Sequence, residues 1–157
     1  MPRINAERVI GTIEGDFVVF LIGMRVNKLW RPDKWVPTAK AMVGMLKELY
    51  SAGPESGFLG HQPLSTFNMA QYWRSFDHLE AYARAKDQAH WPAWVDFNRR
   101  MKSSRGDVGL WHETYLVPAG RYEAIYSGMP DFGLAKAAAR VPVTERNTSA
   151  RDRIASH

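Results

Sequence analysis

The sequence predicts one α+β domain with the order strand, helix, strand, strand, helix, strand, and one further strand at the C-terminal end. Runs of strand-forming apolar residues recur at residues 17–26, 57–67, 69–75 and 108–117. Apolar residues at helical spacing lie between the first and second runs and between the third and fourth. The chain has 157 residues, enough for a single domain with a substantial core.

The first strand and the first helix have clear boundaries. Residues 17–26 are a continuous apolar run, which is typical of a strand covered on both faces. A loop at 29–35 then carries Trp30 and Trp35. A helix is predicted over 36–52, with Pro37 in its first turn and Gly53-Pro54 ending it.

The middle of the chain predicts a pair of strands and a broken helix. Pro63 indicates an edge strand or an irregularity within residues 57–67. After the strand at 69–75, Ser75 or Asp77 can cap a helix that starts near residue 76. Pro92 breaks that helix or starts a new one.

The strand at 108–117 carries a histidine and a glutamate side by side. Successive side chains of a strand point to opposite faces of its sheet. His112 therefore shares a face with Leu110 and Thr114, whereas Glu113 shares the other face with Trp111 and Tyr115. A short strand is predicted at 122–126, and 133–139 predicts a helical turn or a lid.

The domain is assigned to residues 1–140, and residues 141–157 are predicted to be a basic, flexible tail with few large apolar groups. Helices in this plan cover one sheet face only, yet the strands carry apolar residues on both faces. A second copy of the sheet is the simplest cover, so the patterning predicts a homodimer.

Composition and motifs exclude several classes of site. There is no cysteine, so disulfides and thiolate metal sites are absent. The net charge of +5 is scattered rather than arranged in one stripe, which argues against a nucleic-acid partner. No apolar run reaches the ~20 residues of a membrane span, and no long apolar leader is present, so we expect a soluble, cytoplasmic protein. No His-Glu-x-x-His metal motif and no glycine-rich phosphate loop occur.

Three strings carry a resemblance to a known family. They are Trp111-His-Glu-Thr-Tyr115, Tyr122-Glu-Ala-Ile-Tyr126 and Met129-Pro-Asp-Phe-Gly-Leu134, supported upstream by Tyr72-Trp-Arg-Ser75 and His90-Trp-Pro-Ala-Trp94. Over about residues 10 to 140 the chain resembles the monooxygenase-like family that was long a domain of unknown function and includes a member of the fumagillin pathway.

The resemblance implies the dimeric α/β-barrel superfamily, whose fold is a ferredoxin-like βαββαβ dimer. That group includes cofactor-free monooxygenases, haem-degrading monooxygenases, and haem enzymes such as chlorite dismutases and aldoxime dehydratases. The implied cofactor is therefore none or haem. In the small haem-degrading members a strand tryptophan, a histidine late in the second helix and a first-strand asparagine form the site; Trp73, His90 and Asn27 are the comparable residues here.

His112, Glu113 and Arg74 are the candidate catalytic residues. His112 is a base or a haem ligand, with burial lowering its basicity, or it is a hydrogen-bonded structural histidine. Glu113 is a base if it faces a lumen, or else it forms an ion pair with Arg25 or Arg74, which we favour. The same arginines suit an anionic substrate group or a haem propionate.

Further candidates are predicted to bind substrate. They are Arg25, Trp73, Tyr72, Tyr115, Trp111 and His90, with His90 or His112 as axial ligand if haem is bound. The aromatic residues among them equally suit the core. Trp30 and Trp35 suit a cavity mouth or a dimer contact, and His61 and His78 suit the surface.

Three hypotheses for function remain open. The first is a monooxygenase-like enzyme that acts on a hydrophobic metabolite without a nucleotide cofactor. The second is a haem enzyme, acting as a dehydratase, a peroxidase-like enzyme or a haem-degrading enzyme. The third is a non-catalytic dimer that binds a hydrophobic ligand.

Overall fold

The computed structural model describes residues 3–87, 90–103 and 106–155, and it confirms the α+β fold. The main sheet has the strand order β3-β4-β2-β5, and all neighbouring strands are antiparallel. Its strands are β2 (Phe17–Val26), β3 (Phe58–Ser65), β4 (Asn68–Trp73) and β5 (Val108–Val117). With the helices between them, these strands form the ferredoxin-like βαββαβ arrangement.

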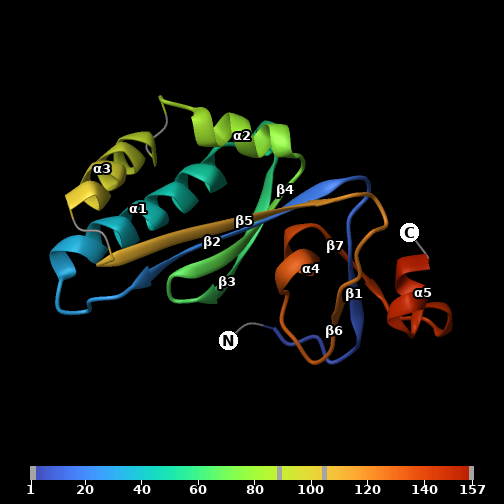
Figure 1. Ribbon diagram of the computed structural model, residues 1–157. Coiled ribbons are helices and arrows are strands. Elements are labelled where there is room, and N and C mark those ends of the chain that lie inside the picture. Colours follow the sequence, from blue (N-terminus) through green and yellow to red (C-terminus); the bar gives the residue numbers. More distant parts are fainter. Residues whose placement is uncertain (1–2, 88–89, 104–105, 156–157) are drawn as a thin grey trace.

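Three helices cover one face of this sheet (Figure 1). They are α1 (Pro32–Ser51), α2 (Phe76–Arg84) and α3 (His90–Ser103). The core lies where the central strands meet α1 and α2, and consists of Val18, Leu49, Trp73 and Leu79. Val18 and Trp73 are paired in the register of β2 and β4, so the core is built on the two middle strands.

The first helix begins earlier than the sequence predicts. Pro32 occupies its first turn, where a missing N–H costs no hydrogen bond, and the Arg31 side chain binds Asp33 at 3.0 and 2.9 Å. Pro37 consequently lies inside the helix, and Trp35 belongs to it rather than to the loop. The predicted cap of α2 is confirmed, because Ser75 Oγ accepts the backbone N–H of His78 at 3.3 Å.

The added strand lies in a second, smaller sheet. This sheet has the order β6-β1-β7, with β1 (Val9–Thr12), β6 (Ile125–Tyr126) and β7 (Ala139–Pro142). The predicted strand at 122–126 is therefore shorter and pairs with β1 instead of extending the main sheet. The polar N-terminal segment supplies the central strand of this second sheet.

The segment predicted as a flexible tail carries secondary structure. It contains the end of β7, a 3-10 turn at Glu145–Asn147 and α5 (Ala150–Ala155). The Arg153 guanidinium is buried and donates from Nε to Glu123 Oε2 at 2.8 Å and from Nη1 to the Thr148 carbonyl at 2.8 Å. The structure differs from the prediction because a buried cation, rather than an apolar side chain, anchors this segment.

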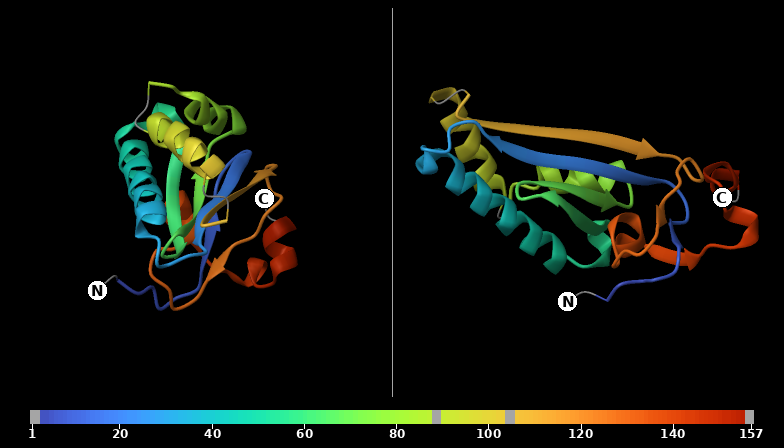
Figure 2. Two further views of the ribbon diagram at one scale, coloured as in Figure 1. Left: turned by 60° about the vertical axis from the view of Figure 1, so that its left-hand side comes forward. Right: turned by 90° about the horizontal axis from the view of Figure 1, so that it is seen from below.

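The other face of the main sheet is only partly covered by the described residues. The short helix α4 (Gly133–Ala137) packs there, with the Ala137 Cβ close to Gly60 of β3. No helix of the described chain covers β2 and β5 on this side (Figure 2). We refer to this surface of β2 and β5 as the open face. Among the described helices none is long and apolar enough to cross a membrane.

Candidate functional site

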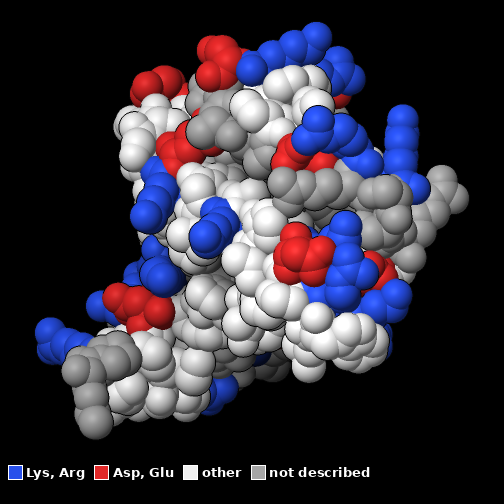
Figure 3. Space-filling view, turned by 90° about the vertical axis from the view of Figure 1, so that its left-hand side faces the viewer, with Lys and Arg blue, Asp and Glu red and all other residues white. Residues whose placement is uncertain are grey.

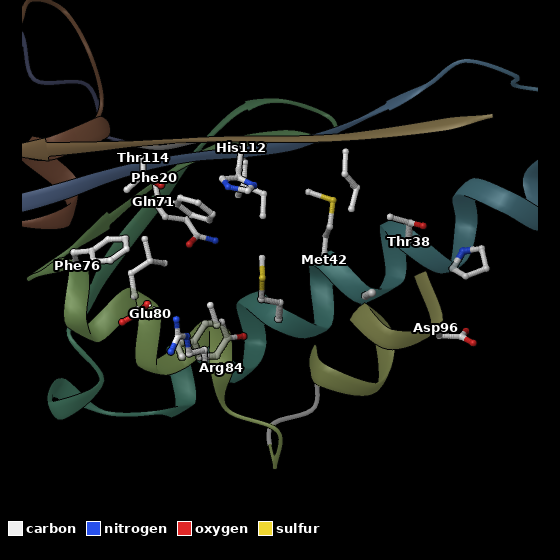
Figure 4. A pocket seen from close by; sticks show the side chains of 18 residues that line it. Phe20, Thr38, Met42, Gln71, Phe76, Glu80, Arg84, Asp96, His112 and Thr114 are labelled. Atoms are coloured by element: carbon white, nitrogen blue, oxygen red, sulfur yellow. Dashed lines mark ion pairs between the residues drawn. The ribbon is translucent and has the colours of Figure 1, made fainter. Parts of the chain in front are cut away.

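A cavity of about 500 Å³ lies between the main sheet and the helices, within the size range of small-molecule sites. Its apolar lining includes Phe20, Ile22, Met42, Met45, Leu79 and Leu110. Its polar lining consists of Thr38, Gln71, Glu80, Tyr82, Arg84, Asp96, His112 and Thr114. The sheet supplies one wall, and α1 and α2 supply the other, with Asp96 of α3 at one end (Figure 4).

His112 points from β5 into this cavity (Figure 4). Its ring lies 5.5 Å from the ring of Phe20, centroid to centroid, with a tilt of 42° between the planes. Among the described residues no group forms a hydrogen bond or ion pair with the imidazole. A histidine with both ring nitrogens available can accept a proton from a ligand and return it.

A buried amide forms a second polar group of the cavity wall. Gln71 of β4 is 1 % exposed, and its Oε1 accepts the indole N–H of Trp73 at 3.0 Å. Trp73 is itself completely buried and packs edge-on against Phe58 at 5.3 Å. Sequence reasoning missed Gln71; the available signal was a glutamine on a strand face otherwise made by Met69 and Trp73.

The α2 side of the cavity carries charges that are already paired. Arg84 Nη2 lies 2.9 Å from Glu80 Oε1, one helical turn away. Tyr82 donates to Glu48 Oε2 at 3.3 Å, and burial together with that carboxylate raises the pKa of Tyr82 well above its usual range. These side chains therefore already bind one another on this wall of the cavity.

Glu113 lies on the open face, away from the cavity. Its Oε2 accepts the hydroxyl of Tyr115 at 2.6 Å, and this bond raises the pKa of Tyr115. Trp111, on the same face, donates its indole N–H to Asn68 Oδ1 at 2.9 Å. Alternation along β5 thus separates His112 from Glu113, as the sequence predicts.

The predicted ion pair between Glu113 and an arginine is wrong. Arg74 donates from Nη2 to the Glu14 carbonyl at 2.9 Å and also to the Asp16 carbonyl, so it is directed to the turn before β2. Arg25 is paired in register with Gly109, whereas Glu113 is paired with Leu21. Four residues of strand separate those positions, roughly 13 Å at ~3.3 Å per residue.

The residues comparable to the haem-degrading site do not come together. Trp73 is fully buried in the core and pairs with Val18 near the start of β2. Asn27 lies beyond the opposite end of β2, roughly 30 Å away at ~3.3 Å per residue. The side chain of His90 lies outside the described part of the structure, so its predicted role remains a prediction.

Tyr72 and the C-terminal strings meet at α4. Burial, with a smaller contribution from Tyr126, raises the pKa of Tyr72 to about 12. Tyr126 Oη accepts the backbone N–H of Leu134 at 3.1 Å, and a Cβ at Gly133 would lie 2.8 Å from that oxygen. Gly133 also has a φ of +54°, which favours glycine. These residues therefore dock α4 on the sheet rather than line the cavity.

Two further histidines and the two tryptophans near the start of α1 have structural contacts or lie at the surface. His61 Nδ1 is 2.8 Å from the Tyr50 hydroxyl, and His78 Nδ1 is 2.6 Å from Ser75 Oγ. Trp30 is 73 % exposed, and Trp35 donates to the Leu29 carbonyl at 3.2 Å. Neither tryptophan lines the cavity, so their predicted place at its mouth is not supported.

Charges of both signs are interspersed on the face that carries the end of the helical layer (Figure 3). One carboxylate is almost buried: Asp107 is 5 % exposed and lies 2.6 Å from Lys28 Nζ and 3.8 Å from Arg31 Nη1. The ammonium of Lys28 holds the pKa of that carboxyl below its usual value. Within the described ranges, no three His, Asp or Glu side chains are grouped so as to hold a metal ion.

Comparison with solved structures places this fold beside the aldoxime dehydratases. A crystal structure of aldoxime dehydratase OxdRE in complex with butyraldoxime superposes with a TM-score of 0.62 at 14 % identity, covering 85 % of this chain and 40 % of that one. A second aldoxime dehydratase gives a TM-score of 0.65 at 15 % identity, covering 88 % of this chain and 42 % of that one. The chain thus spans about two fifths of each dehydratase, and the likeness concerns the fold.

Sequence comparison identifies the family. A search of curated protein sequences gives no significant match. The family described as monooxygenase af470-like matches residues 17–134, which include all four strands of the main sheet and every described residue of the cavity. The chain therefore belongs to the monooxygenase af470-like family.

Proposed function

We propose that the protein is a monooxygenase-like enzyme that binds a hydrophobic metabolite in the cavity and oxidises it with O₂ without an organic cofactor. The observation that carries this proposal is His112, an imidazole directed into an apolar cavity with no partner among the described residues. Membership of a monooxygenase-like family supports the reaction class.

In this mechanism His112 removes a proton from an activated substrate carbon. The resulting carbanion supplies the electrons for O₂, and a carbon–oxygen bond forms to give a peroxide. Loss of the second hydrogen on that carbon, with cleavage of the O–O bond, leaves a new carbonyl and one water. The balance is R₂CH₂ + O₂ → R₂C=O + H₂O, so no external reductant is needed.

The test is oxygen uptake by purified protein with hydrophobic ketones that carry an activated CH₂ group, beginning with 2-tetralone. We expect uptake above the buffer rate, with one labelled atom from ¹⁸O₂ in the product and the other in water. A protein that binds these ketones but consumes no oxygen would instead be a ligand-binding module, and this proposal would be overturned.

Haem is the second candidate, because the sequence resemblance implies it and because His112 can serve as an axial ligand. The charges of the described lining do not suit it. A haem carries two propionates, whereas the charged groups of the lining are Glu80, Asp96 and Arg84, and Arg84 is bound to Glu80 at 2.9 Å. Asp96 is likewise paired, with Arg99, so the described lining has no cation left for a propionate, and the cofactor-independent route ranks first.

An absorption spectrum with added hemin separates the two candidates. On the first proposal the protein leaves the hemin spectrum unchanged. A sharp Soret band that is present in the wild type and lost in His112→Ala would reverse the ranking and identify the ligand.

We also propose that two copies associate through the open face. Trp111 and Tyr115 are 37 % and 50 % exposed there, and no described helix covers β5 on that side. Exposed aromatic side chains beside a few polar groups are typical of protein interfaces. The cavity lies on the opposite side of the sheet, so each copy would keep its own site.

A further inference from the structure

The amide of Gln71 has a fixed orientation. The indole nitrogen of Trp73 is a donor only, so the atom of Gln71 that it contacts at 3.0 Å must be the oxygen. Both side chains are almost fully buried, at 1 % and 0 % exposure, which leaves this bond no competition from bulk water. The NH₂ group of Gln71 is therefore directed away from Trp73.

That NH₂ group lacks a strong acceptor. Its closest partner among the described residues is Met69 Sδ at 3.7 Å, and a thioether sulfur accepts hydrogen bonds weakly. A buried donor without a good partner is unfavourable unless a ligand or water supplies one. The amide end of Gln71 points from the sheet into the cavity, on the same side as His112 (Figure 4).

Strand register places Gln71 and His112 within reach of one small molecule. Gln71 is paired with Phe20 on β2, and His112 is paired with Ile22, two residues further along the same strand. Two strand spacings of ~4.8 Å separate β4 from β5. A ligand that lies against Phe20 can contact both polar groups.

We propose that the Gln71 NH₂ group binds a neutral carbonyl oxygen of the substrate and thereby selects hydrophobic ketones over hydrocarbons of the same shape. This inference rests on the proposed function for its chemical step. As His112 takes the proton from the carbon next to the carbonyl, the electron pair moves to the carbonyl oxygen and forms an enolate. The N–H of Gln71 donates to that oxygen as its negative charge grows.

This assignment replaces the role that the sequence suggested for Arg74 or Arg25. Arg74 is bound to the Glu14 and Asp16 carbonyls, and neither arginine lines the cavity. The arginine that does line it, Arg84, is paired with Glu80. A neutral amide donor matches a neutral carbonyl, whereas a carboxylate substrate would find no unpaired cation in the described lining. Its carboxylates, Glu80 and Asp96, are already paired with Arg84 and Arg99.

The test compares 9-fluorenone with fluorene, which share a rigid tricyclic shape and differ in the carbonyl. Binding is measured by isothermal titration calorimetry, and the carbonyl stretch of bound ¹³C=O fluorenone is measured by infrared difference spectroscopy. We expect the wild type to prefer fluorenone by roughly five- to tenfold, the effect of one hydrogen bond, and to lower the stretching frequency relative to fluorenone in hexane.

Gln71→Met removes the donor at similar volume, and should bring the preference to about one and abolish the frequency shift. The matched control is Gln62→Met on β3, whose amide bonds the backbone of Gly133 and Pro63 outside the cavity. It should keep both the preference and the shift. If Gln71→Met does not fold, the wild-type infrared spectrum still decides, since an unshifted stretch would overturn the inference.

The outcomes separate this inference from the proposed function. Equal binding of the two compounds by the wild type, or a preference that survives in Gln71→Met, overturns the role of Gln71 and leaves the oxygenase proposal standing. Binding of neither compound overturns the role of Gln71, and oxygen uptake with activated ketones then decides the oxygenase proposal by itself. If the protein binds the ketone selectively but consumes no oxygen with any activated ketone, the donor role of Gln71 is supported and the oxygenase proposal is overturned.

Discussion

The two faces of the main sheet differ in whether the polar side chains of β4 and β5 have hydrogen-bond partners. On the open face polar groups bind one another, as in the bonds from Trp111 to Asn68 and from Tyr115 to Glu113. On the helix-covered face His112 has no hydrogen-bond partner among the described residues, and the Gln71 NH₂ group has only a sulfur. A single strand, β5, contributes to both faces.

This difference indicates where chemistry and association each take place. Polar groups that already have hydrogen-bond partners in the protein add little to ligand binding. Fixed polar groups that lack such a partner can bind a substrate strongly. We therefore assign chemistry to the helix-covered face and association to the open face. The following four experiments challenge that division, in order of decreasing expected effect.

The neighbouring residues His112 and Glu113 give the most direct test. His112→Ala should lower oxygen uptake with a turned-over ketone by about 10²- to 10⁴-fold, the usual contribution of a general base. Glu113→Gln should change the rate by no more than about twofold, because Glu113 faces away from the cavity. Equal losses in the two variants, measured with an oxygen electrode, would contradict the division.

A charge on the open face should separate the two copies. Tyr115→Glu places a second carboxylate beside Glu113, and like charges buried together cost several kcal/mol, so the dimer dissociation constant should rise by roughly a hundredfold. The control is Val43→Glu on α1, because Val43 is an apolar residue whose exposed fraction of 55 % is close to the 50 % of Tyr115. Size-exclusion chromatography with light scattering measures both; a wild type that is monomeric at all concentrations removes the dimer proposal.

A substitution at Gly23 tests whether the hydrogen bond between Trp111 and Asn68 is a fixed part of the open face. It lies between Asn68 and Trp111 in the register of β4, β2 and β5. A Cβ there would come within 1.9 Å of Asn68 Oδ1 and 2.8 Å of Trp111 Nε1. Gly23→Ala should displace that hydrogen bond and lower the free energy of unfolding by about 1–2 kcal/mol, with little effect on ligand affinity in the cavity.

Gly44→Ala is the matched control, since a Cβ on that α1 glycine meets nothing within 4 Å. It should raise the free energy of unfolding by about 0.5–1 kcal/mol, the usual gain from replacing a helical glycine. Urea unfolding of both variants checks the opposite signs. A neutral or stabilising Gly23→Ala would show that the indole–amide contact is not a fixed part of the open face.

His61 provides a pH test and a contrast with His112. Both point toward the helix side, from opposite edge strands, but His61 has a hydrogen-bond partner, the Tyr50 hydroxyl, at 2.8 Å from its Nδ1. Partial burial, and to a smaller extent Lys136, lowers the pKa of His61. The unfolded chain therefore binds the proton more readily, so stability is complete above the unfolded pKa of about 6.5 and falls below it.

Because His61 is partly exposed, the effect should be small, on the order of 1–2 °C in Tm between pH 7.5 and 5.5. His61→Gln should lose that portion of the pH dependence, while His112→Ala keeps it. Thermal denaturation followed by circular dichroism suffices. An identical pH profile in His61→Gln and the wild type would assign the dependence to other groups.

Local patterns predicted the main sheet well. The bounds of β2 and β5 agree with the apolar runs at 17–26 and 108–117, because each run ends at polar or turn-forming residues. The separation of His112 from Glu113 follows from alternation alone. Alternation does not say which face the helices cover, and so it left open which of the two residues meets the cavity.

Other features depend on contacts that local patterns do not encode. The pairing of β1 with β7 joins opposite ends of the chain. Arg153 resembles the exposed arginines near it in sequence, yet its contacts with Glu123 bury it. Gln71 belongs to no motif, and its importance depends on the indole two residues away. Neutral polar residues of this kind are recognised only once their surroundings are known.

The smaller sheet also has a consequence for the order of folding. Its central strand β1 is made early during synthesis, but both of its partners, β6 and β7, lie after the whole main sheet. Closing so long a loop carries an entropic cost and slows folding, so the main sheet should form first and β1 should pair last. Until Ala139–Pro142 has been synthesised, the edge of β1 that β7 later occupies is open to pairing with other chains. Slow translation of the last segment would therefore favour aggregation during synthesis.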